Sequence, residues 1–107
     1  MEELQRNLLK VLKRTPQTRA DLCLALGISD RKLRSTVQEL RDSGYNIASN
    51  SNSGGYWLGS ERDKRRIIAE YRSRAYKELA TASAIERGPL EGQIDSLNSN
   101  DMVEDWR

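Results

Sequence analysis

The sequence predicts a mainly α-helical protein with one small β-hairpin, followed by a long C-terminal helix and a flexible tail. Three observations support this prediction. Apolar residues recur at helical spacing through residues 4–40. Two short alternating segments flank a run of Ser, Asn and Gly at residues 49–55, and residues 61–87 contain neither Gly nor Pro. We therefore expect a compact domain at 1–60, a long amphipathic helix at 61–87 and a tail at 88–107.

The first helix is predicted from apolar residues spaced four, three and one apart, which lie on a single helical face. These residues are Leu4, Leu8, Val11 and Leu12. The helix is expected to end before Thr15-Pro16, because proline disfavours helical geometry in the residue that precedes it.

A second helix, at about Arg19–Leu26, is predicted from its capping residues. Thr18 can cap its start, with Asp21 three residues later as the acidic variant of a capping box. Gly27 can adopt the left-handed conformation that ends a helix, and Ser29 can cap the next one. The sequence therefore predicts two helices joined by a tight turn.

The third helix is predicted at about residues 30–43, with Leu33, Val37 and Leu40 on its inner face. Polar side chains occupy the opposite face and its flanks: Arg31, Lys32, Arg34, Ser35, Gln38 and Asp42. One interpretation is an ordinary solvated face. The other is a recognition helix, because a second helix entered through a tight turn is the element that helix-turn-helix proteins place against DNA.

Residues 45–49 and 56–58 alternate as short strands and are expected to pair as an antiparallel hairpin. Gly54 and Gly55 can supply positive φ near the bend. Asn52 and Ser53 at the tip can donate hydrogen bonds to phosphates. The alternative is a flexible loop without contacts, since the tip carries neither Lys nor Arg.

The segment Leu-Gly-Ile-Ser-Asp-Arg-Lys-Leu-Arg-Ser-Thr-Val-Gln-Glu-Leu-Arg-Asp-Ser-Gly-Tyr-Asn-Ile at residues 26–47, followed by Gly-Gly-Tyr-Trp-Leu at 54–58, resembles the winged helix-turn-helix domain of bacterial biotin-dependent repressors and related bacterial and phage regulators. The resemblance covers about half of the chain. It rests on Leu26, Gly27, Ile28, Ser29, Leu33, Val37, Leu40, Arg41 and Gly44. It implies DNA binding through the third helix and the hairpin, which forms the wing. The resemblance stops after Gly59, so control by a small molecule is not implied.

The long helix is predicted to begin after Ser60, which can form a capping box with Asp63. A stripe of residues three and four apart suits packing against another helix. It consists of Ile68, Tyr71, Ala75, Leu79 and Ala82. The stripe can fold back on the first helix or pair with a second copy. We favour a homodimer, because DNA-binding domains of this size gain affinity by dimerising.

The first turns of the long helix hold four cations that could contact phosphates: Arg62, Lys64, Arg65 and Arg66. From these we single out Lys64 and Arg65 as candidate contacts. Local ion pairs with Glu61, Asp63 and Glu70 are the alternative use of these cations.

Composition limits the chemistry that this chain can perform. It has no histidine and a single cysteine, Cys23, which is expected to pack between helices. No disulfide framework, His/Cys metal site or paired-base nucleophile is therefore expected, and we predict neither an enzyme nor a cofactor. The start of the chain has no signal-peptide pattern and no stretch reaches the length of a membrane span, which predicts a cytoplasmic protein.

Charge is distributed unevenly along the chain. Residues 1–86 carry 16 Lys and Arg against 11 Asp and Glu, whereas residues 87–107 carry 2 against 5. A cationic domain suits a polyanionic partner. The acidic tail is expected to be disordered when free, with a docking peptide, an unstructured end and competition with DNA as open alternatives.

Together these features favour a sequence-specific, homodimeric regulator that binds double-stranded DNA. The predicted contacts are Ser29, Arg31, Lys32, Arg34, Ser35, Gln38, Asn52, Ser53, Lys64 and Arg65. The alternative is a protein-interaction adaptor, or an accessory factor in phage or plasmid replication, in which the same domain is a scaffold. The DNA sequence, the direction of regulation and any signal do not follow from the residues.

Overall fold

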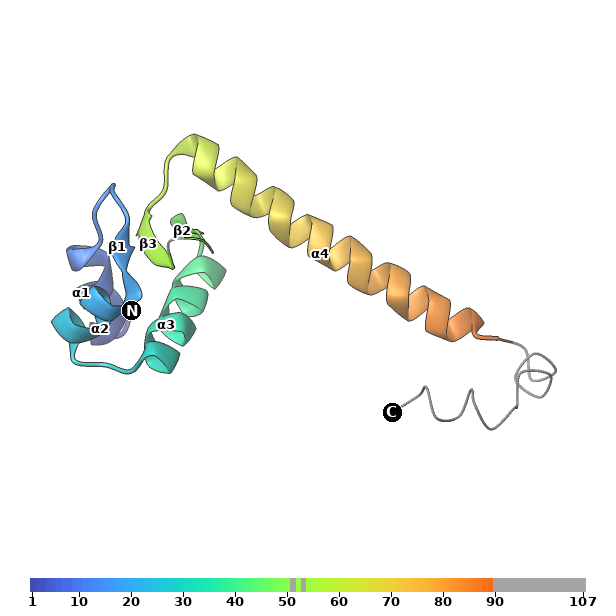
Figure 1. The fold of residues 1–107 in the computed structure, drawn as a ribbon, viewed down its shortest axis with the longest axis horizontal. Helices are drawn as coiled ribbons and strands as arrows, with labels where there is room; N and C mark the ends of the chain where they lie inside the picture. Colours follow the sequence, from blue (N-terminus) through green and yellow to red (C-terminus); the bar gives the residue numbers. More distant parts are fainter. Residues whose placement is uncertain (51, 53, 90–107) are drawn as a thin grey trace. The chain divides into compact units, whose positions relative to one another are not determined.

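The computed structural model describes residues 1–50, 52 and 54–89 of the chain. The chain divides into two units, residues 1–71, which we call the head, and residues 72–107. Figure 1 shows the elements, which in chain order are α1 (Glu3–Val11), β1 (Gln17–Thr18), α2 (Arg19–Leu26), α3 (Asp30–Asp42), β2 (Ile47–Asn50), β3 (Gly55–Leu58) and α4 (Glu61–Arg87). The protein is thus mainly helical with a small antiparallel sheet and a long C-terminal helix. The tail predicted at 88–107 lies outside the described residues from residue 90 onward.

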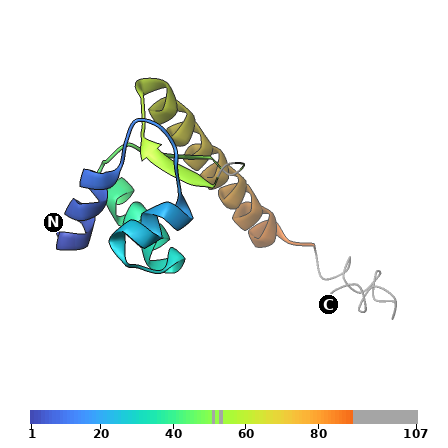
Figure 2. The ribbon, with the colours of Figure 1, turned by 60° about the vertical axis from the view of Figure 1, so that its left-hand side comes forward.

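Helices α2 and α3 are joined by a short turn, as predicted, and Figure 2 shows the chain passing from one to the other. The Thr18 hydroxyl accepts a hydrogen bond from the backbone N–H of Asp21 at 3.0 Å. Gly27 has a φ of 66°, which ends α2 in the left-handed conformation that glycine tolerates best. The Ser29 hydroxyl accepts from the backbone N–H of Lys32 at 3.1 Å and caps α3. The predicted bounds of α2 are therefore confirmed.

Helix α1 ends at Val11, before the predicted limit at Thr15-Pro16, because Leu12 has an extended backbone conformation. The side chain of Gln17 stabilises this early end. Its amide nitrogen donates to the Val11 carbonyl at 2.9 Å, and its amide oxygen accepts from the backbone N–H of Lys13 at 2.8 Å. These two bonds satisfy backbone groups that a longer helix would have paired internally.

The sheet contains a third strand that was not predicted. Its order is β1-β3-β2, and both pairings are antiparallel. Gly55 lies opposite Thr18 in β1 and opposite Asn50 in β2. A Cβ atom at Gly55 would lie 2.8 Å from the Gln17 carbonyl oxygen. Only glycine therefore lets β1 approach β3 this closely, and β1 in turn ties the hairpin to the start of α2.

Strand β2 begins at Ile47 rather than at the predicted Tyr45. The backbone N–H of Tyr45 donates to the Leu40 carbonyl at 3.0 Å, and Gly44 has a φ of 96°. Tyr45 therefore belongs to the C-terminal cap of α3 and cannot join the strand. In the sheet, Ile47 lies opposite Leu58.

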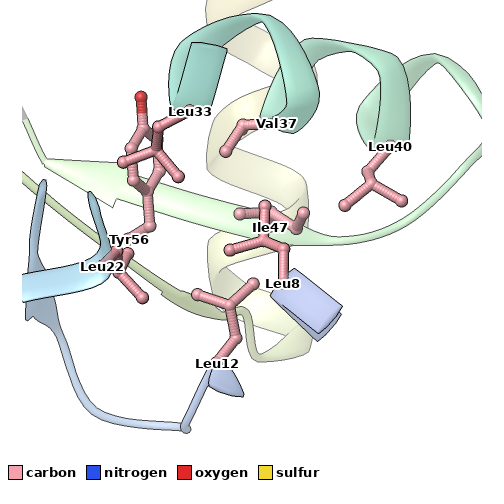
Figure 3. Close-up of a cluster of buried hydrophobic side chains, with 8 residues drawn as sticks. All are labelled: Leu8, Leu12, Leu22, Leu33, Val37, Leu40, Ile47 and Tyr56. Carbon is pink, nitrogen blue, oxygen red and sulfur yellow. The ribbon is translucent and has the colours of Figure 1, made fainter. Parts of the chain in front are cut away.

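The core lies between the three N-terminal helices and the sheet, and Figure 3 shows its side chains. It consists of Leu8, Leu12, Leu22, Leu33, Val37, Leu40, Ile47 and Tyr56. All of these side chains are buried, which confirms the predicted inner face of α3. The Tyr56 ring lies beside Leu33 (Figure 3), and burial raises the pKa of its hydroxyl above 10.0, while the nearby guanidinium groups of Arg41 and Arg19 oppose that shift.

Helix α4 begins with the predicted capping box. The Ser60 hydroxyl accepts from the backbone N–H of Asp63 at 3.1 Å, and the Asp63 carboxylate accepts from the backbone N–H of Ser60 at 3.0 Å. The same carboxylate oxygen accepts from the Trp57 indole N–H at 3.0 Å. The bond from the Ser60 backbone and then the bond from Trp57 lower the pKa of Asp63 below 3.8, because both stabilise the ionised carboxylate. Asp63 thus fixes the start of α4 to β3.

Candidate nucleic-acid interface

Helix α3 presents one buried face to the core and one polar face to solvent. The polar face begins in the first turns of the helix, where Arg31, Lys32, Arg34 and Ser35 are all exposed. Ser29 caps this end. Because the buried face packs on α1, α2 and β2, the polar side chains point away from the rest of the head. The structure therefore brings together five of the predicted contact residues at one end of α3.

Gln38, one turn further along the same face, is exposed but bonded within the head. Its amide nitrogen donates to the Asp42 carboxylate at 2.9 Å, and its amide oxygen accepts from the Tyr71 hydroxyl at 3.2 Å. Gln38 therefore lies where Tyr71, in the third turn of α4, contacts α3. Contact with a base would require both hydrogen bonds to be exchanged for new ones.

Arg19, the first residue of α2, was not predicted as a site residue, and it lies against the start of α3. Its Nε lies 3.6 Å from the Asp30 carboxylate, and the Nε of Arg34 lies 3.0 Å from the other oxygen of that carboxylate. Arg19 also reaches the hairpin, since a Cβ built on Gly54 would lie 3.8 Å from its guanidinium. The cationic surface at this end of the head therefore joins α2, α3 and the hairpin. No local signal in the sequence pairs residues 19 and 30, because tertiary packing brings them together.

The hairpin tip supplies one described candidate, Asn52, which is exposed. Its backbone N–H donates to the side-chain oxygen of Asn50 at 2.8 Å, a local bond typical of Asn in turns. Ser53 lies outside the described residues.

Lys64 and Arg65 are exposed in the first turns of α4. Lys64 lies near the C-terminal end of α3, away from Arg31 and Lys32. It lines a cavity of about 260 Å³ together with Arg41, Gly44, Tyr45, Asn46, Ile47, Ile67, Ile68 and Tyr71. Arg31 and Arg41 are about 15 Å apart along the helix axis, at 1.5 Å per residue. The structure therefore does not gather all the predicted DNA contacts at one point.

Two arginines, Arg41 and Arg66, make hydrogen bonds that hold the head together. Arg41 donates to the Ile47 carbonyl at 2.9 Å and to the Ser49 hydroxyl at 3.0 Å, which ties the hairpin to α3. Arg66 donates to the Ser49 carbonyl at 3.2 Å and pairs with Glu70 at 3.0 Å. For Arg66, local ion pairing is therefore the observed arrangement.

The predicted apolar stripe of α4 divides between the two units. Ile68 and Tyr71 lie in the head, with 39% and 37% of their surface exposed, and Tyr71 bonds to α3. The other members, Ala75, Leu79 and Ala82, are all exposed. Folding of this stripe onto α1 was one expectation, but the bonds of Tyr71 go to Gln38 and Arg41 of α3.

Residues 1–50, 52 and 54–89 contain no cluster of His, Cys, Asp or Glu suited to a metal ion. None of the helices in these ranges has the length and hydropathy needed to cross a bilayer. Cys23 is half-buried and packs against the core, as expected.

Comparison of the chain with protein-family models, curated proteins and solved structures found no match. The fold and the chemistry of the α3 surface are therefore the basis for assigning a function.

Proposed function

We propose that this protein binds double-stranded DNA through the exposed face of α3, and that its head is a winged helix-turn-helix domain. The observation that carries this proposal is the cluster of Arg31, Lys32, Arg34 and Ser35 on the uncovered side of a helix. An α-helix is about 10–12 Å wide and the major groove of B-DNA is about 12 Å wide, so α3 fits the groove. Arginine and lysine at its first turns match guanine edges and phosphates.

The hairpin and the start of α2 support the same function. Strand β1 fixes the hairpin beside α2, and Arg19 lies between the Asp30 carboxylate and the hairpin tip. With α3 in the major groove, Arg19, Asn52 and Ser53 are suited to the adjacent DNA backbone. Lys64 and Arg65 are proposed to bind phosphates further along the duplex. A protein of this kind acts in the cytoplasm, as a regulator of transcription.

Binding is expected to be strongly salt-dependent. Arg19, Lys64 and Arg65, the three cations proposed to contact the DNA backbone, give six in a dimer, and six phosphate contacts correspond to a loss of about 1000-fold in affinity between 50 and 200 mM salt. Fluorescence anisotropy of a labelled random-sequence duplex measures this loss. Absence of binding at low salt would reject DNA as the ligand, and binding that is insensitive to salt would reject an electrostatic interface.

We also propose that α4 joins two copies of the chain. Its stripe continues into the second unit as Ala75, Leu79 and Ala82, and Leu79 is 63% exposed in the single chain. Small alanines between larger apolar residues allow two helices to approach closely. A homodimer places two α3 helices on one duplex and increases affinity without new contacts in either head.

Leu79→Glu is expected to shift the assembly from dimer to monomer, since it places a charge in the middle of an apolar helix pair. Sedimentation equilibrium should give about twice the chain mass of 12.2 kDa for the wild type and a single chain for the variant. Leu24→Glu, at an exposed position in α2, is the matched control and should remain dimeric. A wild-type protein that sediments as a single chain at every concentration contradicts the dimer.

A protein-interaction adaptor is the second candidate function. It is favoured by three large side chains in the second half of α4 that are mostly exposed, Tyr76, Leu79 and Ile85. Exposed apolar residues of this kind suit a protein partner as well as a second copy. An adaptor that does not bind DNA would leave the random duplex unbound at low salt.

A further inference from the structure

The first residue of α3, Asp30, lies between two arginines that come from different helices. Its Oδ2 is 3.0 Å from the Nε of Arg34, one turn further along α3, and its Oδ1 is 3.6 Å from the Nε of Arg19. The carboxylate also lies at the positive end of the α3 dipole, which attracts its negative charge. Asp30 is therefore held from two sides at the end of α3 that carries the cationic surface.

The position of Asp30 relative to the Arg34 guanidinium determines what Arg34 can bind. The closest atom of Arg34 to the carboxylate is Nε, so Asp30 lies at the inner edge of the guanidinium. The two terminal nitrogens form the outer edge, and their parallel N–H groups match the O6 and N7 acceptors of guanine. An arginine held at Nε also loses less side-chain entropy on binding than one that moves freely.

We propose that Asp30 is a positioning residue that orients Arg34 for bidentate contact with guanine. This inference rests on the proposed DNA-binding function and deepens it, because it assigns one base to one residue. Arg19 completes the arrangement by neutralising the second carboxylate oxygen, which limits the repulsion between Asp30 and the phosphates.

The proposal predicts two opposite effects of a single substitution. Asp30 carries a negative charge beside a polyanion, so its removal strengthens binding to every duplex. Removal of Asp30 also frees the Arg34 side chain, so it weakens the preference for guanine at one position. A residue that only contributes charge would produce the first effect without the second.

The test begins with a duplex selected from a random pool by the wild-type protein. Arg34→Ala identifies the position that Arg34 reads, as the one where replacing G·C by A·T no longer lowers affinity. Wild type is expected to prefer guanine there by about tenfold, within the range for one bidentate contact. Asp30→Asn is expected to reduce this preference to about twofold and to raise the affinity for random duplex about twofold.

Asp42→Asn is the matched control, since it removes the same charge from the other end of α3. It keeps an acceptor oxygen for its bond from Gln38, and it should leave the guanine preference at the Arg34 position unchanged. Circular dichroism of each variant checks that the head is folded. If Asp30→Asn strengthens binding to the G·C and A·T duplexes equally, the positioning role is overturned while DNA binding stands. If the wild type binds no duplex at low salt, the proposed function itself fails, and the inference fails with it.

Discussion

Leu33→Ala is expected to destabilise the head by about 2–5 kcal/mol, which at the upper end of this range unfolds most of the molecules at room temperature. Leu33 is completely buried and belongs to the single cluster that joins the three N-terminal helices to the sheet (Figure 3). Truncation of a buried leucine to alanine costs about 2–5 kcal/mol, through lost apolar contacts and a residual cavity. A core in a domain of this size supplies about 3–5 kcal/mol of net stability. The substitution therefore removes a large part, and at the upper end of this range all, of the free energy of unfolding.

The matched control is Leu24→Ala, which deletes the same atoms from a side chain in α2 that is 85% exposed. Its effect should stay within about 0.5 kcal/mol of the wild type, because the side chain is already in water. Urea unfolding followed by circular dichroism measures both variants. Equal midpoints for Leu33→Ala and Leu24→Ala would show that the described core does not stabilise the protein.

The second large effect is expected from reversing two charges on the cationic surface of α3. The double variant Arg31→Glu and Lys32→Glu replaces two cations by two anions at the end of the helix that is proposed to enter the groove. Each lost contact of this kind costs about 1–3 kcal/mol, so affinity for duplex DNA should fall by about 100-fold or more. The loss should affect every sequence, because both phosphate and base contacts are removed.

This double variant should fold normally, which makes its effect on binding interpretable. Both side chains are exposed, so no core packing changes. Glutamates at these positions lie in the first turn of α3, where the helix dipole favours negative charge. The Ser29 cap uses the backbone N–H of Lys32 and not its side chain, so the cap is retained.

Much of the fold could be predicted because its signals are local. Helix α2 is bounded by a Thr cap and a left-handed Gly27, and α4 begins with the Ser60–Asp63 capping box. Signals of this type involve residues within four positions of one another. The inner face of α3 followed from the spacing of Leu33, Val37 and Leu40 in the same way.

The features that were not predicted depend on residues far apart in the sequence. Strand β1 has two residues, too few for a periodic signal, and exists because Gly55 lets it approach β3. The Arg19–Asp30 pair and the bonds from Arg41 to β2 likewise arise only when the helices pack on the sheet. The exposed face of α3 was predictable as a list of residues, whereas the approach of Arg19 to the Asp30 carboxylate required the fold.

The central claim is that the exposed face of α3 binds duplex DNA. The most direct test is a titration of one random-sequence duplex at low salt with the wild type, the Arg31→Glu/Lys32→Glu variant and a control, Lys10→Glu/Lys13→Glu. The control makes the same change in net charge at Lys10, in the last turn of α1, and at Lys13, two residues after the end of α1. Helix α1 packs on the buried side of α3. The predicted result is a loss of about 100-fold or more for the α3 variant and a much smaller loss for the control. Equal losses for both variants, or no binding by the wild type, would contradict the claim.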